Sequence, residues 1–373
     1  MLTIELRPQA VEQEIQVPCF DVINRFKSVV SYCHEPCYNL SLLHVQMKNV
    51  GLSIYGRLGN NVMQLLDAIY YCNTGECKKI VYNLGGGTVN HEALGDIGSI
   101  LPFPFECRLP SGTEILFTNE ACAKPLPFNA SEQYSFGPGS SLPRAVDAFS
   151  IKDSPLRLKS FNKDIKYFGR LFLKACLQKS STFNDAPFQS DDVALVHLRG
   201  EDVFRKYFNH QRAVHPGYPQ PPLSYYKGVV KRLVRKKGIS RIILMPQDYM
   251  NPVFVPLWES LKSMGNEASV ELLSVGLLDT VILLLSCTYL ISSRGTFVPS
   301  FGSLSSRLKA IVSFRDFANF DTVLSARKIK TILIKDQAAS YTPVGTWNSS
   351  EEQIKLMLSY PMSSLDFGKN WKK

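Results

Sequence analysis

The sequence lacks the features that would mark a membrane-spanning, exported or repetitive protein. No stretch reaches the ~18–20 uncharged apolar residues that a spanning helix needs, and the most apolar run, 281–291, is short and preceded by Asp279. The N-terminus has neither the basic start nor the small-residue cleavage site of a secretory signal. No internal repeat or low-complexity tract is present. We therefore expect a cytoplasmic or soluble protein without a transmembrane segment.

A cysteine framework is also missing. The chain has nine cysteines among 373 residues, and the close pairs Cys33/Cys37 and Cys72/Cys77 have no matching second pair to complete a zinc site. Free, partly buried thiols are the expectation. No metal or cofactor site is predicted.

The length and the pattern of apolar residues indicate an α/β protein of two domains. A chain of 373 residues exceeds what one hydrophobic core usually supports. We expect two Rossmann-like domains with parallel sheets, covering residues 1–185 and 186–373, the first with an irregular insertion at about 84–150 rich in Pro, Gly and Ser. The second domain would also carry a C-terminal extension.

Strands and helices are predicted to alternate along most of the chain. In the first half we expect strands at 52–55 and 79–83 and helices at 60–72 and 155–179. In the second half the expected order is strand 193–198, a helix from 224, strand 241–245, helix 253–264, strand 270–273, helix 277–287 and strand 289–291. Such alternation favours parallel sheets with right-handed crossovers.

The charge balance is basic, with 42 Lys and Arg against 32 Asp and Glu and a net charge of +10. Part of the excess lies in the run 231–237, which taken alone would suggest nucleic-acid binding. However, Tyr226, Val229 and Leu233 form an apolar stripe at helical spacing, so the basic residues should occupy the solvated face and the C-terminal end of a helix. We expect no nucleic-acid partner; the basic surface would attract an anionic nucleotide or an anionic membrane face.

Arg199 is the strongest functional candidate. It follows the apolar strand 193–198, and ligands of open α/β sheets bind outside the carboxyl ends of strands. A guanidinium can bind two phosphate oxygens at once, so an arginine here suggests a diphosphate ligand. The alternative is a surface arginine paired with Glu201 or Asp202, with His197 as a satisfied core histidine.

Two other segments have a similar strand–turn–helix design. Residues 54–64 join an apolar strand to a helix through Gly56 and Gly59, and residues 289–297 do so through a turn of small hydroxyl residues and Gly295. Such turns direct backbone amides and a helix dipole at a phosphate.

Together the three segments resemble the fucosyltransferase superfamily, specifically its α-1,2-fucosyltransferase-like branch. In the first motif, Gly-x-Leu-Gly-Asn-Gln-x-x-Gln, Asn61 replaces the first glutamine and the matching residues are Gly56, Leu58, Gly59, Asn60 and Gln64. In the second, His-x-Arg-(Arg or Ser)-Gly-Asp, Gly200 and Glu201 depart and the matching residues are His197, Arg199 and Asp202. In the third, a serine-rich turn, the matching residues are Ser293, Thr296 and Phe297.

The resemblance implies a GT-B-like fold of two facing Rossmann-like domains and an inverting, metal-independent glycosyltransferase. The sugar would be L-fucose, moved from GDP-fucose to a glycan hydroxyl, and the chain has no Asp-x-Asp motif of the metal-dependent kind. The partners would be the nucleotide sugar and a glycan acceptor.

Site roles follow from the chemistry that sugar transfer needs, because charge builds on the departing diphosphate and a proton leaves the acceptor. The predicted catalytic residues are Arg199, Asp202 and Asn60. The base is left open among Asp202, Glu201, His210 and His215, and Asp202 could instead brace Arg199. The predicted residues for the nucleotide sugar are Gly56, Arg57, Gly59, His197, Arg199, Asp248, Ser293, Gly295, Thr296 and Phe297. The predicted acceptor-side residues are Gln64, His210 and His215.

Three alternatives stay open. The chain could use a different nucleotide sugar, because Gly200, Glu201 and Arg294 depart from the motifs that bind it. It could be a catalytically inactive, glycan-binding relative. Nucleic-acid binding is the third and least favoured.

Overall fold

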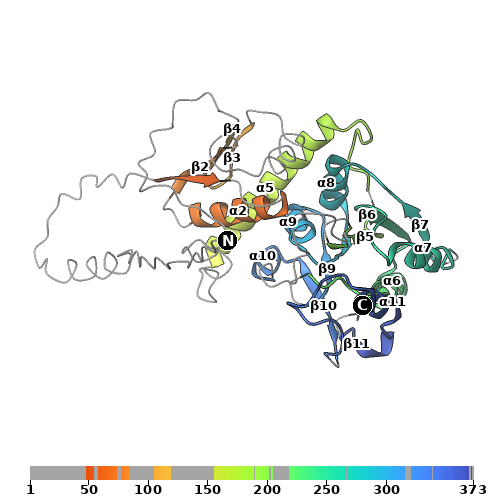
Figure 1. Ribbon diagram of the computed structural model, residues 1–373. Helices are drawn as coiled ribbons and strands as arrows, with labels where there is room; N and C mark the ends of the chain where they lie inside the picture. The colour runs from red at the N-terminus through yellow and green to blue at the C-terminus, as the bar shows by residue number, and fades with distance from the viewer. Residues whose placement is uncertain are drawn as a thin grey trace, which may run out of the picture. The chain divides into compact units, whose positions relative to one another are not determined.

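A computed structural model of the chain describes residues 48–53, 58–73, 77–83, 105–118, 155–188, 190–200, 203–204, 218–265, 267–315, 321–337, 339–368 and 371. All of them belong to one compact unit, Met47–Lys373. They form two β-sheets with helices packed on them (Figure 1).

The smaller sheet has four strands in the order β1-β2-β4-β3. β1 (Lys48–Ser53), β2 (Cys77–Asn83) and β4 (Glu114–Thr118) are parallel, and α2 (Leu58–Cys72) connects the first two. β3 (Phe105–Arg108) pairs antiparallel with β4 through a tight turn at Gly112, whose φ of 92° favours glycine. Residues 105–118 were expected to be irregular, and the hairpin corrects that expectation.

The larger sheet has seven strands in the order β11-β10-β9-β8-β5-β6-β7. Its strands are β5 (Val193–Leu198), β6 (Arg241–Pro246), β7 (Ser269–Leu272), β8 (Tyr289–Ile291), β9 (Ala310–Phe314), β10 (Lys330–Asp336) and β11 (Leu365–Asp366). All neighbouring pairs are parallel except β10 with β11. With β5 counted as the first strand, β7 to β10 follow the 3-2-1-4-5-6 order of the Rossmann fold.

Helices connect these strands and pack against the faces of the sheet. They are α5 (Pro155–Lys179), α6 (Leu223–Lys237), α7 (Phe254–Lys262), α8 (Leu277–Ser286), α9 (Phe297–Leu304), α10 (Asp321–Ala326) and α11 (Glu351–Ser359), with a 3-10 turn η3 (Met362–Ser364). The α/β class with parallel sheets, expected as GT-B-like, is confirmed by this strand order. The domain boundary at 185/186 stays a prediction.

The larger sheet is buried on both faces, as a parallel sheet must be. Val193 and Leu195 of β5 belong to one core with α2, α5, α8 and α9, whereas Ala194, Val196 and Leu198 point into the other core with α6 and α7. The continuous apolar run of β5 is therefore explained by its central position.

Among the described residues, no helix has the length and apolar content needed to cross a bilayer. Cys107, Cys176 and Cys287 are free and buried, and burial raises the pKa of the Cys176 thiol to about 12. Cys72 is disulfide-bonded, which corrects the expectation of free thiols at that position.

Candidate functional site

The strand order fixes where a ligand site should lie. The chain leaves β5 toward β6 on one side and later returns to β8 on the other, so the connections diverge between β5 and β8. A crevice forms at the carboxyl ends of two strands where this happens, and ligands of open α/β sheets bind there. Arg199 follows β5, and the turn 292–296 follows β8. Two of the three sequence motifs thus meet at the switch point of the sheet.

Arg199 is held in a defined orientation. Its Nη1 donates to the carbonyl oxygen of Arg294 at 3.0 Å, across the switch point. The guanidinium carbon lies 4.6 Å from the centre of the Tyr218 ring. The backbone carbonyl of Arg199 accepts a 2.8 Å hydrogen bond from Nδ2 of Asn251, which lies in the turn between β6 and α7. The first two contacts orient the guanidinium, and the third holds the backbone of Arg199.

Tyr218 and Gln220 were not predicted as site residues. Gln220 is fully buried, and its Nε2 donates to the carbonyl oxygens of Tyr218, at 3.0 Å, and Arg294, at 3.4 Å. Tyr341 Oη donates to the Gln220 carbonyl at 2.6 Å, and this hydrogen bond helps to hold Gln220 in place. In the sequence both residues stand among the prolines 219, 221 and 222 that precede α6, a pattern that does not by itself place them at the edge of the sheet.

The turn after β8 depends on Gly295. Its φ is 154°, and a Cβ at this position would lie 2.6 Å from Arg199 Nη1. The glycine therefore lets the turn approach the guanidinium closely. Thr296 then begins α9 with its backbone in the right-handed region and makes no side-chain cap, so the helix start is not an ordinary threonine N-cap.

His197 lies beneath this turn and is almost fully buried. Its Nδ1 is 2.9 Å from Ser293 Oγ, and its ring centre is 6.0 Å from that of Phe297. Burial, followed by the charge of Arg199, lowers the pKa of His197 to about 3. The ring is therefore neutral near pH 7 and braces Ser293 and Phe297. A direct contact of His197 with the sugar nucleotide stays a prediction.

The first motif reaches the same turn through Gly59. A Cβ on Gly59 would lie 2.7 Å from the backbone nitrogen of Phe297, and Ser300 Oγ donates to the Gly59 carbonyl at 2.8 Å. The space that a Gly59 side chain would need is filled by the start of α9, and the predicted contact of Gly59 with the sugar nucleotide stays a prediction. The glycine thus allows α2 to pack against α9. Asn60 and Gln64 lie on the same helix, and their roles stay predictions.

Asp248 lies two residues beyond β6, on the side of β5 opposite to β8. A Cβ added to Gly200 would lie 2.1 Å from Asp248 Oδ1 and 2.3 Å from Oδ2, so the carboxylate fills the space over this glycine. Met250 N donates to Asp248 Oδ1 at 2.8 Å, and Gly200 N donates to Gln247 Oε1 at 3.3 Å. Asp248 thus lies in space against Gly200, the residue that follows Arg199 in the chain.

Five predicted site residues lie outside the described part of the chain: Gly56, Arg57, Asp202, His210 and His215. Their positions relative to Arg199, including any pairing with Asp202, stay predictions. Within the ranges that the structure describes, no group of three or more His, Cys, Asp and Glu side chains could hold a metal ion.

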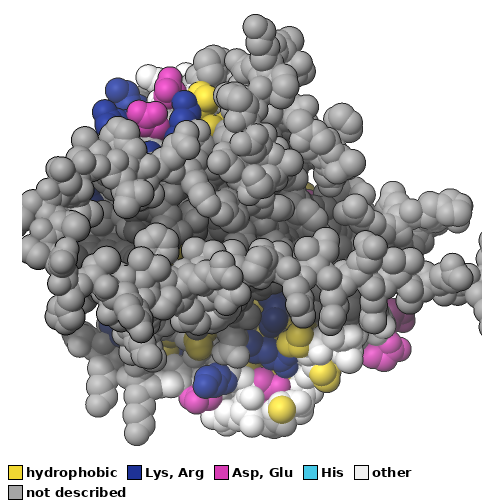
Figure 2. All heavy atoms as spheres, turned by 90° about the vertical axis from the view of Figure 1, so that its left-hand side faces the viewer, with side chains coloured by type: hydrophobic (Ala, Val, Ile, Leu, Met, Phe, Trp, Pro, Cys, Tyr) yellow, Lys and Arg dark blue, Asp and Glu magenta, His cyan; other side chains and the backbone are white. Residues whose placement is uncertain are grey.

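The basic run 231–237 is confirmed as one face of an amphipathic helix. Val229, Val230 and Leu233 are fully buried, and α6 ends at Gly238 in the left-handed conformation. Arg232 stacks 3.5 Å from the Phe367 ring centre, and Arg235 makes a bidentate 2.9 Å ion pair with Glu267. These contacts of Arg232 and Arg235 favour a structural role for the basic run. Figure 2 shows one face of the molecule, on which described Lys and Arg side chains lie beside Asp and Glu.

The solved structures that the chain resembles share little sequence with it. No family model matches the chain, and no match was found among curated proteins. A solved Escherichia coli ADP-heptose lipopolysaccharide heptosyltransferase II has 11% sequence identity and a TM-score of 0.31, covering 77% of this chain and 90% of that one. The E. coli heptosyltransferase WaaC with ADP has 10% identity and a TM-score of 0.32, covering 83% and 97%. WaaC with ADP-2-deoxy-2-fluoro heptose has the same identity and TM-score, covering 83% and 98%.

Proposed function

We propose that the chain is an inverting, metal-independent glycosyltransferase that moves a sugar from a nucleoside diphosphate to a glycan hydroxyl. The observation that carries the proposal is the meeting of Arg199 with the turn 292–296 at the switch point of a Rossmann-type sheet. The three motif resemblances support L-fucose, from GDP-fucose, as the sugar.

The proposed chemistry is assigned to residues at this edge. When the bond between the sugar and the diphosphate breaks, negative charge grows on the leaving group. Arg199 would bind that charge in a bidentate manner, and the N-terminus of α9 would add its dipole and backbone amides. His197, neutral and buried, would keep Ser293 and Phe297 in place beneath the turn.

The acceptor hydroxyl must lose a proton during the same step. We propose Asp202 as the residue that accepts it and Asn60 as a polar partner in the reaction, with Gln64, His210 and His215 on the acceptor side. A well-placed base contributes roughly 100- to 10,000-fold to a rate. Asp202→Asn should therefore lower kcat strongly while KM changes little.

The test is turnover by the purified chain with a panel of nucleotide sugars that includes GDP-L-fucose and ADP-linked sugars. We expect hydrolysis or transfer with GDP-L-fucose, and we expect it to persist in excess chelator. Activity with another nucleotide sugar, and none with GDP-L-fucose, would show that the proposed donor is wrong while the proposed reaction stands. Turnover that chelation abolishes and manganese restores would contradict the leaving-group role of Arg199. Tight glycan binding without turnover would identify an inactive relative.

One observation bears on how the nucleotide is recognised and does not select its sugar. The carboxylate of Asp248 occupies the space over Gly200, where the resembled motif has an arginine or serine side chain. A negative charge thus lies where relatives carry a positive or neutral one, so the part of the nucleotide that binds there must be a hydrogen-bond donor.

A further inference from the structure

We propose that Asp248 is the residue that recognises the ribose hydroxyls of the nucleotide, and that the nucleoside end of the sugar donor therefore lies over the carboxyl end of β6. This inference rests on the proposed function, because it assumes that the diphosphate binds at Arg199. It assigns an orientation to the ligand and makes the site selective for ribonucleotides.

The charges along the edge of the sheet support this orientation. The β8 side of Arg199 carries the guanidinium contact to Arg294 O and the N-terminal end of α9, which suits an anion. The β6 side carries a carboxylate, which repels phosphate and accepts hydrogen bonds from hydroxyl groups. A nucleoside diphosphate has the matching order of groups, since its diphosphate is followed by the ribose hydroxyls and then the base.

The carboxylate is held in place by specific contacts. The backbone N–H of Met250 donates to Asp248 Oδ1 at 2.8 Å, so the turn after β6 fixes one oxygen. The absence of a side chain at Gly200 is required, because a Cβ there would lie 2.1–2.3 Å from the carboxylate atoms. Asn251 ties the same turn to β5 by donating to the Arg199 carbonyl at 2.8 Å. A shift of the carboxylate relative to Arg199 is therefore resisted.

The residues that follow Asp248 suit the nucleobase. Tyr249 is 59% exposed and Met250, the next residue, is 48% exposed, so both side chains are accessible to a ligand. The Tyr249 ring packs against Phe254, with ring centres 5.0 Å apart. An exposed aromatic ring beside a hydroxyl-binding carboxylate offers a stacking surface for a planar base.

The test compares ligands that differ only at the ribose. Calorimetry would measure the affinity of GDP, ADP, their 2′,3′-dideoxy forms and inorganic pyrophosphate for the wild type and for Asp248→Asn, Gly200→Ala and Glu259→Gln. The wild type should prefer the ribonucleotides by about 10- to 100-fold, as expected for hydrogen bonds to a charged group. In Asp248→Asn this preference should fall to within about threefold of unity, while pyrophosphate affinity stays the same or rises.

Gly200→Ala provides an independent variant, because its new Cβ displaces the carboxylate without removing it. It should lose the same preference. Glu259→Gln is the matched control: it removes an exposed carboxylate from α7 and should keep the full preference. An unchanged ribose preference in both Asp248→Asn and Gly200→Ala would overturn the inference. Pyrophosphate binding tests the proposed function separately. If Arg199→Ala binds pyrophosphate as tightly as the wild type, the proposed function is contradicted, whatever the ribose preference.

Discussion

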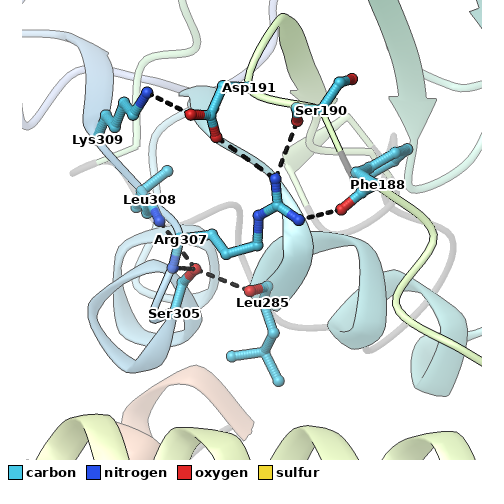
Figure 3. A network of polar contacts seen from close by, with 8 residues as sticks. All are labelled: Phe188, Ser190, Asp191, Leu285, Ser305, Arg307, Leu308 and Lys309. Atoms are coloured by element: carbon cyan, nitrogen blue, oxygen red, sulfur yellow. Dashed lines mark hydrogen bonds and ion pairs between the residues drawn. The ribbon is translucent and has the colours of Figure 1, made fainter.

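Arg199 and Arg307 lie at opposite edges of the same parallel sheet and contact different groups. At the amino edge, Arg307 donates to the carbonyl oxygens of Phe188 and Ser190 and lies 3.4 Å from Asp191, which also pairs with Lys309 at 2.8 Å (Figure 3). At the carboxyl edge, the contacts of Arg199 include the carbonyl of Arg294 and the ring of Tyr218.

The difference shows how the position on a strand decides the use of an arginine. The Arg307 network joins the loops before β5 and β9 and includes a carboxylate, so its charge serves the fold. The Arg199 contacts fix the direction of a guanidinium at the edge where helix N-termini also point. Both arginines follow or precede apolar runs in the sequence, and only the topology separates them.

The largest effect should come from placing a methyl group between the turn and Arg199. Gly295→Ala puts a Cβ 2.6 Å from Arg199 Nη1 and should lower kcat/KM by about 100-fold or more, because misplacing a reacting group by ~1 Å has that effect. Gly345→Ala is the control, since its φ of 97° gives similar backbone strain with nothing within 4 Å of the new Cβ. Steady-state kinetics that show equal losses in the two variants would refute a special role for the turn.

The two edges should also differ in how pH affects stability. The folded pKa of His197 is about 3, below the unfolded value near 6.5, so its contribution is fully present above that value and is lost as the pH falls from about 6.5 toward 3. The slope should approach ~1.4 kcal/mol per pH unit. At the amino edge, the hydrogen bond to Lys309 lowers the pKa of Asp191, so its smaller contribution is lost only as the pH falls below about 4.

Urea unfolding of His197→Gln and Asp191→Asn across this pH range would separate the contributions of His197 and Asp191 to the pH dependence of stability. His197→Gln should flatten the profile between pH 6.5 and 4, whereas Asp191→Asn should leave that part unchanged. The reverse pattern would mean that His197 is protonated in the folded protein.

A smaller effect is expected at Tyr218. Removing the ring in Tyr218→Ala should weaken pyrophosphate binding by about 2- to 30-fold, as a cation–π contact of ~0.5–2 kcal/mol implies. Tyr218→Phe keeps the ring face and should bind like the wild type. Calorimetry on both variants checks this; equal weakening by phenylalanine would assign the effect to the hydroxyl group instead.

The smallest effect should come from the basic helix. Lys231→Glu with Lys236→Glu changes four charge units on the solvated side of α6, away from the contacts of Arg199, and should leave kcat unchanged. Nucleic-acid binding by the wild type should be weak and should fall steeply with salt. Strong binding that the double variant abolishes would favour the nucleic-acid alternative.

The sequence was sufficient for the elements with clear periodicity. Helix 155–179 and strands 193–198 and 289–291 were predicted with the observed bounds, because a buried strand reads as an unbroken apolar run and a long helix as an amphipathic one. The hairpin at 105–118 was missed because its strands are only four and five residues long and are joined by a tight turn. β9 and β10 were not predicted either, although both are apolar.

The site was predicted in part for a similar reason. Arg199 and Gly295 could be placed because each follows a recognisable strand. The contacts of Tyr218 and Gln220 join residues far apart in the chain, and no local pattern encodes such contacts. The packing of Gly59 against Phe297 likewise joins residues far apart in the chain, so the glycine was assigned to the ligand rather than to a neighbouring helix.

The central claim is that the carboxyl edge between β5 and β8 binds a diphosphate through Arg199. The most direct measurement is calorimetry of GDP and pyrophosphate binding to the wild type, Arg199→Ala, Arg199→Lys and Arg307→Ala, with a melting temperature for each. We expect Arg199→Ala to lose most of the affinity at a nearly unchanged melting temperature, Arg199→Lys to recover little of it, and Arg307→Ala to melt earlier while binding both ligands. Unchanged affinity in both Arg199 variants would contradict the claim.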